Sequence, residues 1–464
     1  MKSVAIIGAG ITGLTAAFYL KRAGVPVTVY EAGGSIGGVI RSERKYGFLV
    51  EYGPNTILET SPKIAQLVRD ASLESRKLTP APKSDARYVV RYKRPIAMPS
   101  SPLGFLTTEL FSLKAKLAVL REPYVAQRRG GAEESIAQFV MRRLGREFLD
   151  HAIDALVAGI YAGDPHKLSL EQAFPKLKAL EDKYGSFIKG QIFGALDRKK
   201  SGEVAKDRAP KFSFDEGLQV LPDTLRGRLG DSVKLNTAVT KLAQSDDGWM
   251  LEMRDAEGES CAEHSAVIYC GTAYKLAELK MESRKPVSFS AFLEIRHPPV
   301  ASVVLGFRRR DVSHPCNGFG MLIPKVEGFK ILGTIFSSSL FPNRAPVGHV
   351  ALTSYVGGER QPELASLPHD ELIALVCEDL RILLGVSAAP VFTHCAVWPK
   401  AIPQYNVGYG KFRALMTQIE TDAPNFFLAG HYRDGISLAD SIVSGCNIAE
   451  RVEKLLAPVQ GARS

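Results

Sequence analysis

The chemistry-bearing residues nearest the start of the chain are three closely spaced glycines and one acid. Gly8, Gly10 and Gly13 have the G-x-G-x-x-G spacing of a dinucleotide-binding turn. The first glycine permits a tight turn, the second lets a pyrophosphate approach the backbone, and the third lets a helix pack closely on the strand. Glu31 follows where its carboxylate can accept both ribose hydroxyls and would repel a 2′-phosphate. These residues predict an adenine dinucleotide without that phosphate as the ligand.

A βαβ unit must position these four residues, and the surrounding sequence supplies its parts. Val4–Ile7 is an apolar run that suits a buried parallel strand, residues 14–22 suit a helix, and residues 27–30 suit a second strand. The alternative is a glycine-rich turn without a ligand, which the agreement of strand, spacing, helix and acid disfavours. The residues of this unit that we expect at the ligand are Gly8, Ala9, Gly10, Ile11, Thr12, Gly13, Glu31 and Ala32.

A second glycine pair and the far end of the chain narrow the choice of dinucleotide. Gly37 and Gly38 permit another close backbone approach, and Arg41 offers a guanidinium fork for phosphate, whereas an ordinary NAD domain has no need of this pair. Residues 425–430 are typical of a strand that ends in a glycine turn, and residues 435–456 of a helix. Together with the run 48–55, these segments resemble the flavin amine-oxidase and protoporphyrinogen-oxidase superfamily, whose members bind FAD in an extended pose.

The resemblance implies a wider FAD site. The start of the C-terminal helix would lie near the N1–C2 edge of the flavin and stabilise the negative charge of the reduced ring. Arg41 could instead be an ordinary surface arginine, Val239 a plain strand residue, and the C-terminal helix only a packing element. The residues that the resemblance implies at FAD are Gly38, Val39, Arg41, Gly53, Pro54, Asn55, Thr56, Val239, Ala429, Gly430, Ile436, Ser437 and Leu438.

Composition limits the class of protein. The 464 residues are 45% apolar and 23% charged, which suits two or three globular domains. No run approaches the roughly 20 apolar residues of a membrane span, and we expect no cleavable signal. The net charge of +10 favours anionic partners or simply a solvated basic surface, and no motif indicates nucleic acid. Six scattered cysteines predict free thiols in a reducing cytoplasm, and neither they nor the histidines have metal-ligand spacing.

The fold class that we expect is mixed α/β, with a Rossmann-like FAD-binding domain assembled from separated segments. Strand-like runs at 233–240, 249–254 and 266–270 supply a middle segment of that domain. Alternating runs between 286 and 395, with a helix that begins at Pro368, predict a mixed-sheet substrate domain. The expected domains are 1–60 with 205–285 and 396–464 for FAD, 61–89 with 286–395 for substrate, and 90–204 for a helical insert.

The helical insert mixes exposed-type leucines with basic residues. Residues 103–121 interleave Leu113, Leu117 and Leu120 with lysine and arginine. Such a surface could lie on an anionic membrane, or it could be an ordinary helix packed on a core. We therefore expect a cytoplasmic protein that can contact the inner face of the cell membrane peripherally. The sequence leaves open whether the protein forms a homodimer.

Three further blocks narrow the resemblance. The runs 48–55, 159–165 and 398–405 resemble the oxygen-dependent, FAD-containing protoporphyrinogen oxidases and the closely similar bacterial coproporphyrinogen III oxidases. That resemblance implies an enzyme of heme biosynthesis, which takes six electrons from a porphyrinogen in three flavin turnovers while dioxygen is reduced to hydrogen peroxide. Two positions depart from the pattern: Tyr409 stands where several relatives have His, and Asn55, where some have Arg, removes one cation near the flavin.

A porphyrinogen is apolar across its faces and carboxylated at its rim, so its site needs an apolar slot and at least one cation. The resemblance implies that Arg87 pairs with a propionate, for which a guanidinium fork is suited, and that the carbonyl of Gly159 accepts a macrocycle N–H. It places Phe319, Leu322 and Tyr355 in the slot walls, although each could be a core residue. No catalytic side chain is expected, because the flavin performs the redox step.

The sequence leaves rivals open. The substrate could be protoporphyrinogen, with two propionates, or coproporphyrinogen, with four. Another flavin oxidase, such as an amine oxidase or a carotenoid desaturase, would use the same FAD motifs but lacks the blocks around Arg87 and Gly159. A flavin-binding scaffold without catalysis is the alternative from a different class.

Overall fold

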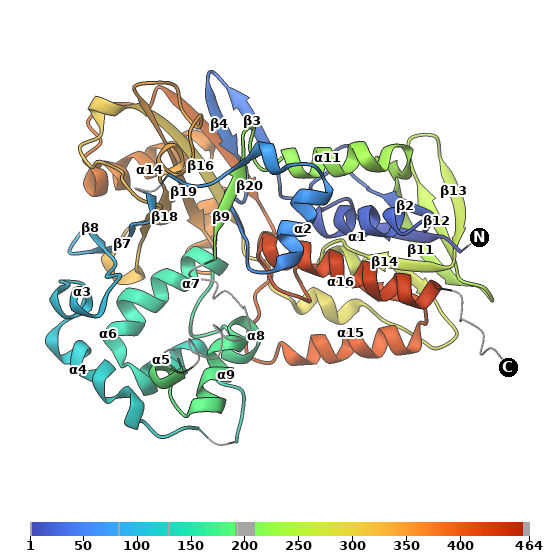
Figure 1. Ribbon diagram of the computed structural model, residues 1–464, viewed down its shortest axis with the longest axis horizontal. Helices are drawn as coiled ribbons and strands as arrows, with labels where there is room; N and C mark the ends of the chain where they lie inside the picture. The colour runs from blue at the N-terminus through green and yellow to red at the C-terminus, as the bar shows by residue number, and fades with distance from the viewer. Residues whose placement is uncertain (1, 82–83, 129, 191–192, 194–208, 458–464) are drawn as a thin grey trace.

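The computed structural model describes residues 2–81, 84–128, 130–190, 193 and 209–457 (Figure 1). At one end of the molecule lies a five-stranded parallel sheet in the order β10-β2-β1-β14-β21. Its strands are β1 (Val4–Ile7), β2 (Val27–Tyr30), β10 (Val233–Lys234), β14 (Ala266–Tyr269) and β21 (Phe426–Leu428). The strands come from three distant parts of the chain, as expected for an FAD-binding domain assembled from separated segments.

Both faces of this sheet are covered. Val4 and Ile6 face one hydrophobic core and Ala5 faces another, because successive side chains of a strand point to opposite sides. The first core includes residues of four helices: α1 (Ile11–Arg22), α2 (Pro62–Asp70), α11 (Val220–Leu229) and α16 (Leu438–Leu456). The second includes α15 (Gly410–Asp422) and a sheet in the order β13-β12-β11-β15, formed by β11 (Ala238–Gln244), β12 (Trp249–Arg254), β13 (Glu259–His264) and β15 (Lys280–Glu282).

The two ends of the chain are packed directly on one another. Figure 1 shows blue α1 and red α16 side by side. The hydroxyl of Thr12 donates to the carbonyl of Ser441 at 3.1 Å, and a Cβ on Gly445 would lie 2.6 Å from the carbonyl oxygen of Thr12. The helices can approach this closely only because Gly445 lacks a side chain. The predicted helix at 14–22 begins earlier, at Ile11.

The single strand predicted at 233–240 is wrong, because the structure has two strands there. Asn236 adopts a left-handed backbone conformation with φ of 52°, which ends β10 and redirects the chain. β10 then belongs to the parallel sheet beside β2, whereas β11 belongs to the antiparallel sheet. The predicted strands at 249–254 and 266–270 are found as β12 and β14.

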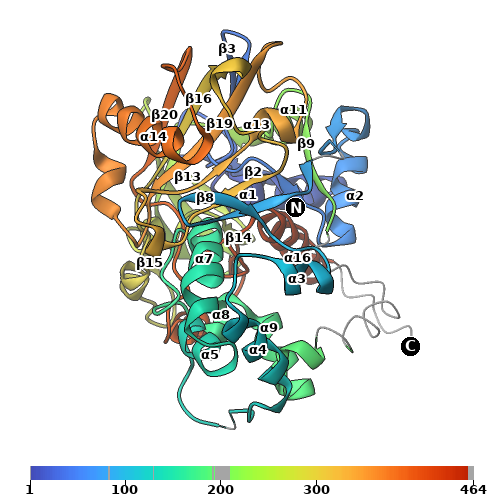
Figure 2. The ribbon, with the colours of Figure 1, turned by 90° about the vertical axis from the view of Figure 1, so that its left-hand side faces the viewer.

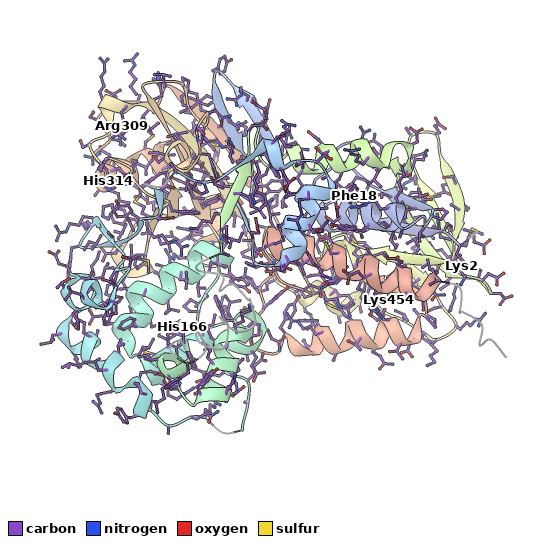
Figure 3. The ribbon with its side chains drawn as sticks, in the orientation of Figure 1. Lys2, Phe18, His166, Arg309, His314 and Lys454 are labelled. Carbon is purple, nitrogen blue, oxygen red and sulfur yellow. The ribbon has the colours of Figure 1, made fainter. Side chains whose placement is uncertain are left out.

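A larger mixed sheet forms the other end of the molecule, in the order β20-β16-β19-β18-β17-β7-β8. Its strands are β7 (Arg87–Arg91), β8 (Arg94–Ala97), β16 (Val300–Arg308), β17 (Gly320–Leu322), β18 (Ile331–Ile335), β19 (His349–Gly357) and β20 (Phe392–Trp398). The helix α14 (His369–Leu384) shares a core with this sheet, and Figure 3 marks the outer end of the sheet with Arg309 and His314. The strands and helix expected between 286 and 395 are therefore present.

The segments between the two sheets refine the expected organisation. β7 passes through the boundary expected between residues 89 and 90, because β7 and β8 form one hairpin. The helix α2, expected with the substrate sheet, packs in the same core as α1 and α16. A hairpin, β3 (Ser42–Lys45) with β4 (Phe48–Glu51), and the small sheet β5-β9-β6 complete this region, with β5 (Ile57–Leu58), β6 (Lys77–Leu78) and β9 (Lys211–Phe214).

The insert is mostly helical, as expected, and lies below the mixed sheet in Figure 2. Its helices are α3 (Pro102–Thr107), α4 (Leu113–Arg121), α5 (Ile136–Arg143), α6 (Arg146–Phe148), α7 (Asp154–Tyr161), α8 (Leu170–Ala173) and α9 (Pro175–Tyr184). A π-helix at Leu149–Ile153 leads into α7, which packs on β17 and β18. Residues 129, 191–192 and 194–204 of the expected insert lie outside the described residues. Within the part of the chain that the structure describes, no helix is both long enough and apolar enough to span a membrane.

Candidate functional site

The first glycine motif forms an open cradle at the start of α1. Gly8 has φ of 105°, a conformation that glycine adopts without strain. Gly10 caps α1, no side chain caps the helix there, and a Cβ added to Gly10 would meet no atom within 4 Å. The first N–H groups of a helix have no partner inside it, so they face this open space. The cradle fits a pyrophosphate, which brings acceptor oxygens and negative charge to a helix N-terminus.

The second glycine pair lies against the first motif. The N–H of Gly37 donates to the carbonyl of Ala9 at 2.8 Å, and a Cβ on Gly38 would lie 3.5 Å from the Cα of Gly10. The first glycine motif and the second glycine pair, which are separate in the sequence, therefore line one cradle. Val39, at its rim, is about half exposed and touches the next segment, since a Cβ on Gly53 would lie 2.6 Å from the carbonyl oxygen of Val39.

Arg41 lies just beyond this pair. Its guanidinium carbon is 4.6 Å from the centroid of the Tyr52 ring, and its side chain is exposed. Stacking on an aromatic ring restricts the guanidinium without using its N–H donors. The proposed phosphate role of Arg41 stays a prediction.

The carboxylate of Glu31 is fixed at the end of β2. One oxygen accepts the N–H of Ala9 and the other accepts the N–H of Gly33, each at 2.8 Å. Each oxygen keeps a lone pair for a further donor, so the carboxylate is oriented for a ribose. The turn before β11 is attached here, because Thr237 donates to the carbonyl of Glu31 at 2.8 Å. Val239 lies two residues after Thr237, next to a bulge in β11, and its role at the cofactor stays a prediction.

The C-terminal motif closes the same site. Gly430 has φ of 116°, and a Cβ there would lie 3.8 Å from the hydroxyl of Thr12. Ser437 caps α16 by accepting the N–H of Asp440, while the carboxylate of Asp440 accepts from Ser437 in return. Ile436 and Leu438 flank this cap and pack partly into the two cores. The positive end of the α16 dipole therefore lies close to the cradle.

The five residues expected at the substrate lie on one sheet and on the helix packed against it. Arg87 on β7 pairs with Gly320, the first residue of β17, and Leu322 pairs with Val89. Phe319, just before β17, donates its N–H to the carbonyl of Ala86 at 2.8 Å. The sheet register therefore places β7, the strand that carries Arg87, beside Phe319 and Leu322.

Gly159 and Leu322 are in direct contact. A Cβ on Gly159 would lie 2.4 Å from Cδ2 of Leu322, so no larger residue fits without displacement. Gly159 lies in the last turn of α7, which Ala162 ends in a left-handed conformation with φ of 48°. The last four carbonyls of a helix have no partner inside it. The carbonyl of Gly159 is among these, which is what the proposed role as an acceptor requires.

Tyr355 joins the two halves of the site. Its hydroxyl donates to the carbonyl of Gly53 at 3.1 Å and accepts from the side-chain amide of Asn55 at 2.7 Å. Burial raises the pKa of Tyr355, so the hydroxyl stays protonated and can donate. A residue expected at the substrate thus holds the segment, Gly53 to Thr56, that is expected at the cofactor.

The histidines beside the C-terminal glycine turn are neutral. Burial lowers the pKa of His431 to about 4, with a smaller contribution from His297. Burial likewise lowers the pKa of His297 to about 4. Their ring centroids are 6.5 Å apart. Neither imidazole therefore adds a positive charge to the site near neutral pH.

Sequence reasoning missed two features of this site. The link from Tyr355 to Asn55 joins residues 300 positions apart, and only the packing of the folded chain reveals it. Lys211, at the start of β9, lies near Phe319 and Arg87. Its basic side chain was the only available signal, and that signal did not distinguish it from the other lysines.

Comparisons with known proteins agree with this geometry. Residues 11–453 match the profile of the family described as flavin containing amine oxidoreductase. The chain is 36% identical to protoporphyrinogen oxidase 2, chloroplastic/mitochondrial, of Arabidopsis thaliana, over 97% of this chain and 94% of that one. It is 30% identical to coproporphyrinogen III oxidase of Bacillus subtilis (strain 168), over 96% of each.

Solved structures show the same fold. A candidate protoporphyrinogen oxidase from Exiguobacterium sp. 255-15 matches with a TM-score of 0.82 at 22% identity, over 98% of this chain and 99% of that one. Cyclohexylamine oxidase from Brevibacterium oxydans IH-35A matches with a TM-score of 0.70 at 16% identity, over 98% of this chain and 100% of that one.

The residues present fit an FAD cofactor. The glycine cradle leaves room where a pyrophosphate would lie, and Glu31 is oriented beside it for a ribose. The N-termini of α1 and α16 supply positive potential to an anionic group. With both ends of the chain in one dinucleotide site and a match that extends from residue 11 to residue 453, this chain belongs to the flavin containing amine oxidoreductase family, with FAD as its cofactor.

Proposed function

We propose that this protein is an oxygen-dependent protoporphyrinogen oxidase of heme biosynthesis. The full-length similarity to a plant protoporphyrinogen oxidase supports this function. The observation that supports it furthest is the contact of Tyr355 with Gly53 and Asn55, because it joins the sheet that we expect to bind substrate to the segment that we expect to bind FAD. The substrate would then lie between Arg87, the carbonyl of Gly159 and the flavin.

The reaction removes six electrons and six protons from protoporphyrinogen and reduces three molecules of dioxygen to three of hydrogen peroxide. The hydride acceptor, and the route by which electrons reach dioxygen, would be supplied by FAD held in the glycine cradle. Arg87 would hold a propionate with a bidentate pair of hydrogen bonds. The carbonyl of Gly159 would accept a pyrrole N–H, which favours loss of hydride from the adjacent carbon. The α16 dipole would stabilise negative charge at the reduced cofactor.

The direct test mixes the FAD-loaded protein with protoporphyrinogen and follows porphyrin fluorescence together with peroxide. We expect both to rise, with three peroxides for each porphyrin. In Arg87→Ala we expect KM to rise more than kcat falls, because a rim carboxylate is held equally in the ground state and in the transition state. A yellow protein that oxidises no porphyrinogen would overturn the proposal and favour a flavin-binding scaffold.

Coproporphyrinogen III is the second candidate substrate. The similarity to the Bacillus subtilis coproporphyrinogen III oxidase supports it. The ratio of kcat/KM on the two porphyrinogens decides between them. Oxidation of coproporphyrinogen alone would assign the second function.

We further propose that α3 and α4 contact an anionic membrane at the inner face of the cell membrane. Both helices lie at the outer edge of the insert (Figure 1). Leu103 and Leu113 are 71% and 73% exposed, and Leu117 on α4 is also exposed. Lys114 and Arg121 are exposed beside these leucines. Apolar side chains flanked by cations suit the headgroup region of anionic lipid.

Flotation with vesicles tests this contact. We expect co-flotation with vesicles that contain phosphatidylglycerol and less with phosphatidylcholine alone. The double variant Leu113→Ser/Leu117→Ser should lose most of the binding. Leu293→Ser is the matched control, since Leu293 is equally exposed but lies outside the insert. Equal flotation of both variants would refute the proposed contact surface.

A further inference from the structure

Lys211 is a partly buried cation beside the predicted substrate slot. It begins β9, and its side chain is 13% exposed. Its ammonium nitrogen lies 5.8 Å from the centroid of the Phe319 ring. In the small sheet it pairs with Leu58, two residues after the segment 53–56 expected at FAD. The lysine therefore lies where the expected substrate and cofactor regions meet.

Arg87 is a backbone neighbour of the segment that contains Phe319. The N–H of Phe319 donates to the carbonyl of Ala86, and the next residue, Gly320, pairs with Arg87 in the sheet. Burial and then the charge of Arg87 lower the pKa of Lys211. Burial and a neighbouring cation both disfavour the charged form of Lys211, and a carboxylate bound at the ammonium group would offset this.

Within the residues that the structure describes, Lys211 pairs with the carboxylate of Asp85, which is a weak partner. Oδ1 of Asp85 lies 3.9 Å from the ammonium nitrogen, and the Asp85 side chain is 85% exposed. An exposed ion pair at this distance contributes little, because water screens it. An incoming carboxylate can therefore replace Asp85 at Lys211 with little loss.

We propose that Lys211 and Arg87 together bind two neighbouring carboxylates on one edge of the porphyrinogen, which makes Lys211 a second substrate-binding cation. The inference rests on the proposed function and deepens it. Both candidate porphyrinogens carry propionates on two adjacent pyrroles. The planar guanidinium would take one propionate by a bidentate pair, and the flexible ammonium would take the other as a point charge. Phe319, which is close to Lys211 and next to the residue that pairs with Arg87, would be an apolar support for the macrocycle.

This arrangement would fix which edge of the macrocycle faces β7 and β9. The centre of the macrocycle would then lie at the carbonyl of Gly159, which contacts Leu322, and the opposite edge would point away from the two cations. Because both candidate substrates share the dicarboxylate edge, Lys211 would contribute to the binding of each. Discrimination between them would depend on residues at the opposite edge.

The test compares protoporphyrinogen with its dimethyl ester in the FAD-loaded Lys211→Met variant. We expect KM for the diacid to rise about tenfold, the size of one lost hydrogen bond to a charged group, with kcat nearly unchanged. KM for the ester should equal that of the unmodified enzyme. Lys211→Arg should restore most of the affinity. Binding of the product protoporphyrin, followed by fluorescence quenching, should weaken in parallel and needs no turnover.

Lys77→Met is the matched control. Lys77 lies on β6, the neighbouring strand of the same small sheet, where its ammonium nitrogen is 2.5 Å from Glu59 and 4.5 Å from the ring centroid of Phe212. We expect it to leave both KM values unchanged.

Each other outcome overturns a distinct statement. An equal rise in KM for diacid and ester would show that Lys211 acts only through packing. An unchanged KM for the diacid would remove Lys211 from the site. A rise confined to coproporphyrinogen would assign Lys211 to one of the additional propionates and refute the shared edge. Failure of the unmodified enzyme on every porphyrinogen would instead refute the proposed function.

Discussion

The nucleotide-binding half and the helical insert are each stabilised by a different kind of interaction. In the first, helices and strands approach through glycines: a Cβ on Gly13 would lie 2.1 Å from the carbonyl oxygen of Gly8. In the insert, by contrast, charged side chains are buried. The side chain of Arg143 is 0% exposed and pairs with two equally buried acids, Glu122 and Glu181. The first arrangement depends on the absence of side chains, the second on specific partners.

The two regions also differ in the pKa values of their buried glutamates. Burial of Glu122 opposes ionisation, yet Ser186, two backbone N–H groups and Arg143 hold its pKa below the usual range. Glu51 on β4 has fewer partners, and burial raises its pKa to about 7. The insert has stabilised its buried charge, whereas the nucleotide-binding half holds one acid that is half protonated near neutral pH. We therefore expect different substitutions and a different pH dependence to destabilise the two regions.

The largest expected effect comes from removing one member of the ion cluster. Arg143→Met leaves Glu122 and Glu181 buried without that cation, and breaking a buried pair in this way costs about 3–5 kcal/mol. We expect the loss to appear in urea unfolding followed by far-UV circular dichroism. The triple variant Arg143→Met/Glu122→Gln/Glu181→Gln should recover much of it, because the buried charges are removed together. A single variant as stable as the parent would show that the cluster contributes no specific stabilisation.

The second largest effect is expected from Gly13→Ala, which changes the nucleotide-binding half of the molecule. The added methyl would clash with backbone, so α1 must move, at a cost of about 3 kcal/mol. FAD affinity, measured by flavin fluorescence during titration, should fall with it, because α1 carries the phosphate cradle.

Gly227→Ala is the control, in a helix of the same half. A Cβ on Gly227 meets nothing within 4 Å. That variant should gain about 0.5–1 kcal/mol and keep its FAD affinity. Equal FAD affinity in both glycine variants would refute the close-approach argument.

The smallest effect is a pH dependence. Glu51 titrates near 7 when folded and near 4.5 when unfolded, so the folded state binds more protons between these values. The free energy of unfolding should therefore fall as pH rises, by roughly 2 kcal/mol between pH 5 and pH 7, and level off at higher pH. Glu51→Gln should flatten that slope in urea unfolding at pH 5, 6 and 7. A slope that persists in the variant would assign the titration to another group.

The nucleotide-binding half was predictable because its constraints are local. The G-x-G-x-x-G turn, the flanking strand and Glu31 lie within one βαβ unit, and the structure holds all of them as expected. The strand break at Asn236 was not predictable, since an apolar run has the same pattern whether it forms one strand or two. The ion cluster of the insert was equally hidden, because its charges resemble those of any solvated helix until burial is known.

By itself, the sequence determined that both ends of this chain are nucleotide-binding segments, since short-range spacing encodes a tight turn and a helix start. It also determined the family, through blocks that extend along the chain. Only the tertiary structure decided that Thr12 meets Ser441, that Tyr355 holds Asn55, and that Lys211 lies beside Phe319. Contacts of this kind depend on strand register and helix packing, which bring together residues whose separation along the chain carries no signal.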